Sequence, residues 1–574
     1  MPKKTLFIIS FLFLISFSLP VLAQPEIGDE QSFRIQANYD FSGRSEIEAI
    51  LARKSLSAYW YVDKEWWDAF SKEEQLEADK VFESLISEFE INIYPTIRAT
   101  FGLERSPGID NDARITLLFH SMIAGAGGYN NTADGYLKIQ LPESNEREMV
   151  YLNLDYFNTE RMKSFIAHEL VHLITFNQKE IINGVTEEVW LNEARAEYAP
   201  TLLGYDDNYQ GSNLEDRVKG FLSKPSDSLT EWREGAADYG AVNLFIQYLV
   251  DHYSVGVLVD SLKSNKTGIE SLNMALEKKG FEENFEQIFE NWVIALLINN
   301  CQVDEKYCYF NNNLKNFRIT PLMNYLPLIG ESTLSVTNAT KDWAGNWHKF
   351  VGGDGTLNIN FNWLGTIGTD SIPYVAQYID GRLVVGELSV NGFQGGKLTV
   401  PQFGSEIISL TIIPLSHVKI SGFGNIEPSR IFSWSASTVE TKEEEIPEII
   451  PPSIVSLSRP ISQMSDSEKD EIKNQLQEFI SSLQGIACAI NQDLYFGLQD
   501  NDQVKCLQEF LKSQGSDIYP EGFVTGNFFT ITEQAVIRFQ EKYANEILTS
   551  WGLTKGTGYV GSTTRNKINE LLGN

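Results

Sequence analysis

Two histidines and a glutamate stand in the otherwise apolar segment "SFIAHELVHLITF", residues 164–176. The apolar residues fall on all sides of a helix, so this segment is expected to be a buried helix. His168 and His172 are four residues apart and share one helical face, which lets both imidazoles reach one zinc ion. Glu169 would then stand beside the water molecule that zinc activates, and the ion would offset the cost of burying its carboxylate. The spacing predicts a catalytic zinc site with Glu169 as general base; the alternative is a core helix with two hydrogen-bonded histidines.

A catalytic zinc needs a third protein ligand and one open position. A metzincin would carry a glycine at position 175 and a histidine at position 178, where this chain has Thr175 and Gln178, so that class is excluded. Several carboxylates follow in "TEEVWLNEARAEYAP", which predicts a second helix that Thr186 can cap. Glu193 is the best candidate, because the twenty residues between it and His172 allow the chain to loop back.

The other glutamates of this second helix have different expected roles. Glu187 and Glu188 would lie in the first turn, where solvated carboxylates are favoured by the helix dipole. Glu197 lies one turn after Glu193 and could accept a hydrogen bond from a ligand histidine, a common second contact around zinc. Otherwise Glu197 would lie on a solvated helix face.

These two segments together resemble the gluzincin metallopeptidases, in particular the hyicolysin-like family, which pairs an HExxH helix with a "WLNEGLAEY"-type helix. The similarity covers about residues 35 to 320 and includes "AGAGGYNN" and "SNEREMVYLNLDYF". It implies a zinc peptidase with the ligands His168, His172 and Glu193. The chain departs from the family at Ala194, where a glycine is frequent, and the added methyl group could narrow the cleft.

The resemblance also implies an oxyanion donor. Tyr239, in "AADYGAVNLFIQYL", matches the position where the family carries a tyrosine before a helix. Its hydroxyl would donate to the tetrahedral oxyanion. The alternatives are a core tyrosine at this position and His252 as the donor. An extended substrate would pair with a strand near "GGYNNTADGY" or "EMVYLNL".

Hydrophobic periodicity divides the rest of the chain. Residues 24–325 mix strand and helix patterns and predict an α+β zincin-like peptidase domain. Residues 326–438 alternate with a period of two, as in "TLNINFNWL", and predict an all-β sandwich-like domain. Residues 439–484 are an acidic, proline-containing linker with a stalk helix. Residues 485–574 resemble a small all-α, three-helix peptidoglycan-binding domain through "QVKCLQEFL" and "TEQAVIRFQ".

The ends of the chain and its composition indicate where it works. Residues 1–23 have the basic start, apolar run and small-residue end of a signal peptide, so we expect a secreted or cell-wall-associated protein. Such a compartment permits disulfides, and local pairing would join Cys301 to Cys308 and Cys488 to Cys506.

The 46 basic and 77 acidic side chains give a net charge of −31, which argues against nucleic-acid binding. No later stretch is long and apolar enough to cross a membrane.

The predicted function is therefore a secreted zinc endopeptidase, tethered to the cell wall by residues 485–574. One alternative is a catalytically inert peptidoglycan-binding surface protein. Another is a peptidase that cuts the peptides of peptidoglycan itself. The residues predict one zinc ion as cofactor and a protein or peptide as substrate.

Overall fold

The computed structural model describes residues 24–327, 332–364, 372–388, 395–417, 427, 429–439, 489–498, 501–515, 517–520, 522 and 524–572. The predicted signal peptide, all but the first residue of the predicted linker and stalk helix, and Cys488 lie outside these residues. The chain divides into two compact units, Met1–Glu443 and Glu444–Asn574, and each is described by itself.

A six-stranded sheet begins the first unit, with the order β1-β2-β3-β4-β6-β5. β3, β4 and β6 run parallel, and the outer strands pair antiparallel. Every residue of the central strand β4 is buried, as its apolar sequence "ITLLFH" requires. The strands are β1 (Glu30–Arg34), β2 (Glu46–Lys54), β3 (Ala58–Asp63), β4 (Ile115–His120), β5 (Gly128–Tyr129) and β6 (Met149–Asn153).

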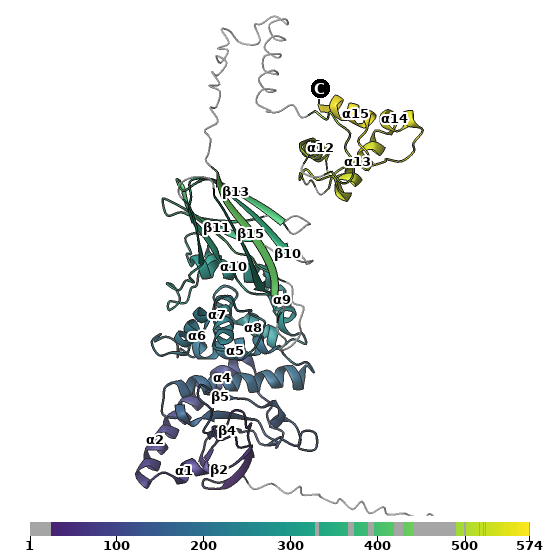
Figure 1. Cartoon of the computed structure of the whole chain (residues 1–574). Coiled ribbons are helices and arrows are strands. Elements are labelled where there is room, and N and C mark those ends of the chain that lie inside the picture. The colour runs from purple at the N-terminus through teal and green to yellow at the C-terminus, as the bar shows by residue number, and fades with distance from the viewer. Residues whose placement is uncertain are drawn as a thin grey trace, which may run out of the picture. The chain divides into compact units, whose positions relative to one another are not determined.

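Helices pack on the face of this sheet that carries Trp60, Leu117 and Leu152, and a helical layer follows (Figure 1). α4 packs against β5 and β6 on one side and against α5 on the other, so it lies at the centre of the region. The helices are α1 (Lys64–Asp68), α2 (Lys72–Glu88), η1 (Phe89–Ile93), α3 (Tyr94–Phe101), η2 (Thr132–Gly135), η3 (Leu154–Tyr156), α4 (Arg161–Phe176), η4 (Asn177–Ile182), α5 (Val189–Leu202), α6 (Asn213–Ser223), α7 (Ala236–Tyr253), α8 (Val255–Leu262), α9 (Gly268–Lys279), α10 (Phe285–Ile298) and η5 (Glu305–Tyr307).

Within the described residues, no single helix has both the length and the apolar composition needed to span a bilayer. α7 and α8 pass that test only as a pair, across a bend of 107°.

The predicted fold class is wrong in the β region. The nine strands among its described residues form one hydrogen-bonded, barrel-like sheet, with the main path β12-β11-β14-β13-β10-β15-β8, and not the two separate sheets of a sandwich. A short parallel pairing of Phe403 in β13 with Ile407 in β14 joins the two halves, while β9 pairs with β14 and β7. The strands are β7 (Leu322–Leu326), β8 (Ser332–Lys341), β9 (His348–Gly352), β10 (Gly355–Leu364), β11 (Pro373–Tyr378), β12 (Leu383–Glu387), β13 (Gly395–Phe403), β14 (Ile407–Ile412) and β15 (Ser429–Val439).

The β region is also not separate from the helices, which is a second error in the predicted fold class. Trp343, Trp347, Val375, Ile413 and Leu415 belong to the same apolar core as the helices. The indole of Trp347 donates to the backbone oxygen of Val293 in α10 at 3.0 Å. Alternation along a strand predicts that one face is buried but not what covers it, so this shared core could not be read from the period.

The C-terminal unit departs from the predicted three-helix domain as well. Its described residues contain four α-helices, α12 (Asp502–Ser513), α13 (Thr530–Lys542), α14 (Ala544–Ile547) and α15 (Ser562–Leu572), with the 3₁₀ turn η7 (Thr549–Trp551). One local arrangement occurs twice. Gln508 accepts from the backbone N–H groups of Thr525 and Gly526, and Gln540 accepts from those of Thr557 and Gly558.

The predicted disulfide between Cys301 and Cys308 is confirmed. The second predicted pair cannot be followed as a pair, because Cys488 lies outside the described residues.

Candidate metal centre

α4 brings the two histidines of the motif to one point. It runs from Arg161 to Phe176 and buries residues on all sides, which fixes its rotation between the sheet and α5. His168 and His172 lie one turn apart, and their Nε2 atoms are 3.0 Å from each other. Two imidazole nitrogens this close can share one cation.

Glu193 completes the cluster from the facing helix α5. Its Oε2 lies 3.3 Å from Nε2 of His168 and 3.5 Å from Nε2 of His172. Zinc ligands about 2.0–2.1 Å from a tetrahedral ion stand about 3.3 Å from one another. The three predicted ligand atoms therefore fit a zinc ion, and they form a candidate cluster in the described part of the chain.

Glu169 lies beside this cluster and is almost completely buried, with 4% of its surface exposed. Its Oε2 makes no hydrogen bond to the described residues, and burial raises the pKa of this carboxyl group. The backbone of Gly128 in β5 approaches it closely, since a Cβ at position 128 would lie 3.0 Å from Cγ of Glu169 and 2.6 Å from the backbone oxygen of Tyr151. Only glycine allows the edge strand to come this near.

Glu197 is held behind the cluster by three side chains. Arg217 donates to both of its oxygens at 2.7 and 2.8 Å, and Asn213 and Asn243 donate to Oε2. Oε1 lies 3.5 Å from Nδ1 of His168, on the far side of the ring from the cluster. The carboxylate is therefore placed to orient His168 and does not lie on a solvated face.

Tyr239 lies in the first turn of α7 and lines the same pocket as the two histidines and Glu169. Its ring packs edge-on against Trp232 and beneath the guanidinium of Arg217. Burial and the nearby charge of Glu193 raise the pKa of the phenol, so it keeps its proton and remains a donor. The alternative donor, His252, lies elsewhere: its Nε2 donates to the backbone oxygen of Cys308 at 2.9 Å.

The pocket that contains the cluster has a volume of about 290 Å³. Its wall includes Tyr39, which the sequence did not indicate as a site residue. The ring of Tyr39 stacks on Tyr129 at 4.7 Å, and Tyr129 in turn stacks on Tyr151 at 4.2 Å. The neighbouring Asp40 fixes the loop through ion pairs with Arg44. No local motif marks Tyr39, because the sheet alone brings the loop after β1 to α4.

Two predictions about the segment before α5 were wrong. Thr186 does not cap the helix, which begins at Val189 with Glu188 at the N-cap position and no side-chain cap. Glu187 is buried, not solvated, with 6% of its surface exposed. It accepts from Arg195 at 2.8 Å, so a tertiary partner has replaced water.

No family model matches the chain, and no curated protein matches it. Among solved structures, a periplasmic inhibitor of g-type lysozyme from Aeromonas hydrophila is similar over 21% of this chain and 98% of its own, with 9% identity and a TM-score of 0.14. The pre-peptidase C-terminal domain of a collagenase from Bacillus anthracis is similar over 20% of this chain and 97% of its own, with 10% identity and a TM-score of 0.14. Similarities at these scores carry neither a fold nor a function over to this chain.

Proposed function

We propose that residues 24–325 form a zinc-dependent endopeptidase of the gluzincin type, with His168, His172 and Glu193 as ligands and Glu169 as general base. The observation that carries this proposal is the set of three ligand atoms 3.0–3.5 Å apart. It is supported by the buried, unbonded carboxylate oxygen of Glu169 beside them.

The chemistry divides between the ion and the side chains. When bound, zinc lowers the pKa of a water molecule and polarises the scissile carbonyl. Glu169 takes a proton from the attacking water and delivers it to the leaving amine. Its surroundings suit this task, because burial raises the proton affinity of the carboxylate.

Tyr239 supplies the remaining donor. Its phenol lines the pocket and stays protonated, so it can donate to the oxyanion as the carbonyl becomes tetrahedral. Glu197 holds His168 by its Nδ1 side and so keeps Nε2 turned toward the ligand cluster.

The substrate is an extended peptide that pairs with β5. This strand ends the order of the six-stranded sheet and pairs with β6 on one side. A peptide added to its other side would run past Glu169, which Gly128 approaches closely.

The test is to measure zinc and peptidase activity together. Purified protein should contain one zinc per chain, cleave casein, lose this activity to a chelator and regain it with added zinc. A protein that binds no zinc, or binds zinc and cleaves neither casein nor cell-wall peptides, contradicts the proposal and leaves an inert surface protein.

We also propose that the C-terminal unit binds peptidoglycan, on the strength of its sequence resemblance to such domains. The full chain should sediment with insoluble cell wall, and a chain ending at Glu443 should remain in solution. Digestion of purified wall in place of casein would identify the peptides of peptidoglycan as the substrate. Equal sedimentation of the two chains would contradict wall binding by this unit.

A further inference from the structure

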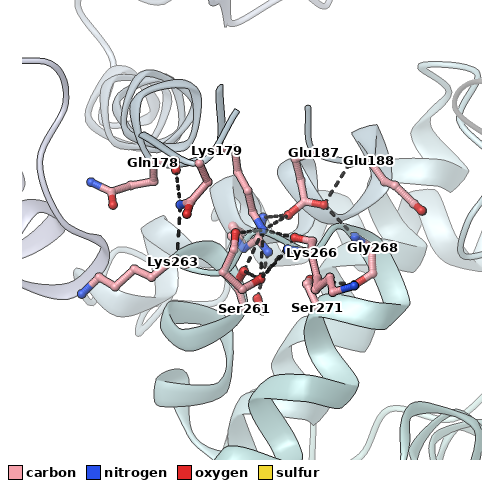
Figure 2. Close-up of polar contacts among 12 residues, drawn as sticks. Gln178, Lys179, Glu187, Glu188, Ser261, Lys263, Lys266, Gly268 and Ser271 are labelled. Atoms are coloured by element: carbon pink, nitrogen blue, oxygen red, sulfur yellow. Dashed lines mark hydrogen bonds and ion pairs between the residues drawn. The ribbon is translucent and has the colours of Figure 1, made fainter. Parts of the chain in front are cut away.

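A second buried charge cluster lies close to the candidate ligands, because Lys179 and Glu187 line the same pocket as the two histidines and Glu193. Figure 2 shows Lys179 and Glu187 with their polar partners. The cluster consists of Lys179, Glu187 and Arg195, called the charge triad below. Glu187 Oε2 lies 2.8 Å from Nη1 of Arg195 and 3.3 Å from Nζ of Lys179. Lys179 and Arg195 are completely buried. Charged groups are almost never buried to this extent without a specific arrangement of partners.

Further partners of the two cations come from α8 and the turn that follows it. Lys179 donates to the backbone oxygens of Ser261 at 2.7 Å and Ser264 at 3.2 Å, and also to that of Lys266. Ser261 lies in the last turn of α8, where the helix dipole favours a cation. Arg195 donates to the hydroxyl of Ser261 at 2.8 Å.

Glu187 is held equally firmly. Its Oε1 accepts from the backbone N–H groups of Glu188 at 3.0 Å and of Gly268 at 2.7 Å. Although burial opposes its charge, Arg195 and Lys179 hold the pKa of this carboxyl group below its usual range. The carboxylate therefore joins the start of α5 to the start of α9 and to both cations.

The positions of the triad along the chain connect it to the metal ligands. Lys179 lies in η4, which continues α4 two turns beyond His172. Glu187 lies two residues before the start of α5, and Arg195 follows Glu193 within α5. The triad thus ties the end of the helix that carries two ligands to the helix that carries the third, and it anchors both on the turn between α8 and α9.

We propose that the charge triad is a positioning device, which fixes α4 and α5 at the separation that lets His168, His172 and Glu193 share one ion. This inference rests on the proposed zinc function. None of the triad residues is a ligand. Their contribution is to prevent Glu193 from moving away from the histidines when the ion is bound or released.

The test compares zinc affinity in full-length variants. Lys179→Met removes one charge of the triad, Glu187→Gln removes the countercharge with little change in shape, and Ser261→Ala removes one acceptor while keeping all three charges. Lys263→Met is the matched control, since this lysine is exposed on the same turn. Zinc dissociation constants are measured at neutral pH by competition with a chelating dye, and folding of the metal-free proteins is followed by circular dichroism.

Loss of a group that holds metal ligands in place typically weakens affinity 10–100-fold. We expect this loss for Lys179→Met and Glu187→Gln, a few-fold loss for Ser261→Ala, and no change for Lys263→Met. The rise in melting temperature on adding zinc should shrink in the same order. The cobalt-substituted variants should also differ from the wild type in visible spectrum, because the ligand geometry has relaxed.

Folded Glu187→Gln and Ser261→Ala proteins that bind zinc as tightly as the wild type would overturn the inference and make the triad a stabilising element alone. If Lys179→Met does not fold, these two milder variants still decide. A wild-type protein without zinc affinity would instead overturn the proposed function, so the two failures are distinguishable.

Discussion

His172 in α4 and His348 in β9 are both buried, yet their pKa values shift in opposite directions. Burial opposes charge on each ring. At His172 the carboxylate of Glu193 outweighs burial and raises the pKa to about 9. At His348 no charge compensates, and burial lowers the pKa to about 4. The difference lies in what the fold places beside the ring: a carboxylate in one region, and the rings of Phe432 and Trp434 in the other.

The same contrast extends to the buried carboxylates. In the β region, Asp342 is paired with Arg430 and also accepts a hydrogen bond from the hydroxyl of Ser416. Its negative charge is therefore compensated by other groups of the protein. Between α4 and α5, Glu169 and Glu193 lie beside the two histidines, and each has an oxygen without a hydrogen bond to the described residues. Carboxylate oxygens without hydrogen-bond partners beside two imidazoles are suited to binding a cation.

The largest expected effect is the loss of zinc from Glu193→Ala. This change removes one of three ligands and leaves two histidines, so metal analysis should find little zinc and activity should vanish. Glu197→Ala is the comparison, because it removes only the group behind His168 and should weaken affinity or activity about 10–100-fold. Zinc loss at 197 with retention at 193 would reverse the two roles.

Glu169→Gln should separate metal binding from catalysis. Glutamine keeps the shape of the side chain but cannot carry the proton, so zinc content should hold while kcat falls about 10²–10⁴-fold. Glu160→Gln, an exposed change at the start of the same helix, is the matched control. Near-wild-type kcat in Glu169→Gln would show that another group is the base.

The ligand cluster could be predicted from the sequence because its information is local. Residues four apart on a helix meet on one face whatever surrounds them, and the chain between His172 and Glu193 is long enough to form a return turn. Tyr39 could not be predicted, because the order of strands in the sheet places it at α4. The prediction for Glu187 was wrong for the same reason. A carboxylate at the start of a helix is expected to be solvated, but Glu187 accepts a hydrogen bond from the backbone N–H of Gly268, which is distant in sequence.

The fold was less predictable than the site. Individual strands such as β4 and β6 follow from apolar runs, and α2 follows from its helical spacing. The closure of the β region does not, because it depends on one short pairing between β13 and β14. Period-two alternation is the same in a sandwich and in a curled sheet, so it cannot distinguish them.

Asp342→Ala tests the buried ion pair between Asp342 and Arg430 in the β region. It leaves Arg430 buried without its partner, and breaking such a pair costs about 3–5 kcal/mol of unfolding free energy. Asp380→Ala is the control, since Asp380 pairs with Arg382 at an exposed position and should cost less than about 1 kcal/mol. Denaturant unfolding gives both values. Zinc affinity of the folded Asp342→Ala protein should be unchanged. A loss of zinc affinity would mean that this ion pair in the β region affects the candidate metal centre.

Tyr239→Phe removes one hydroxyl from the pocket and retains the ring. An oxyanion donor acts in the transition state, so kcat should fall about 10²–10³-fold with little change in KM. Tyr253→Phe, at the other end of α7, controls for the loss of a phenol from this helix. An unchanged kcat in Tyr239→Phe would leave this tyrosine as a packing residue, since His252 already bonds to Cys308 away from the pocket.

The smallest effect concerns His348 and acid. Its pKa is about 4 in the folded protein and about 6.5 in an unfolded chain, so between these values the unfolded state binds more protons. The free energy of unfolding should therefore fall as the pH drops from about 6.5 to about 4, by at most about 3 kcal/mol from this group. Above pH 6.5 the ring is neutral in both states, so His348 does not lower the free energy of unfolding there.

His348→Leu should reduce this acid sensitivity, measured by denaturant unfolding at pH 7 and pH 4.5, and should leave zinc content unchanged. His172→Leu should instead lose zinc at pH 7, because His172 is a proposed zinc ligand, whereas His348 packs against other side chains. An acid sensitivity that persists unchanged in His348→Leu would mean that His348 gains its proton without penalty, and the contrast between the two histidines would then rest on Glu193 alone.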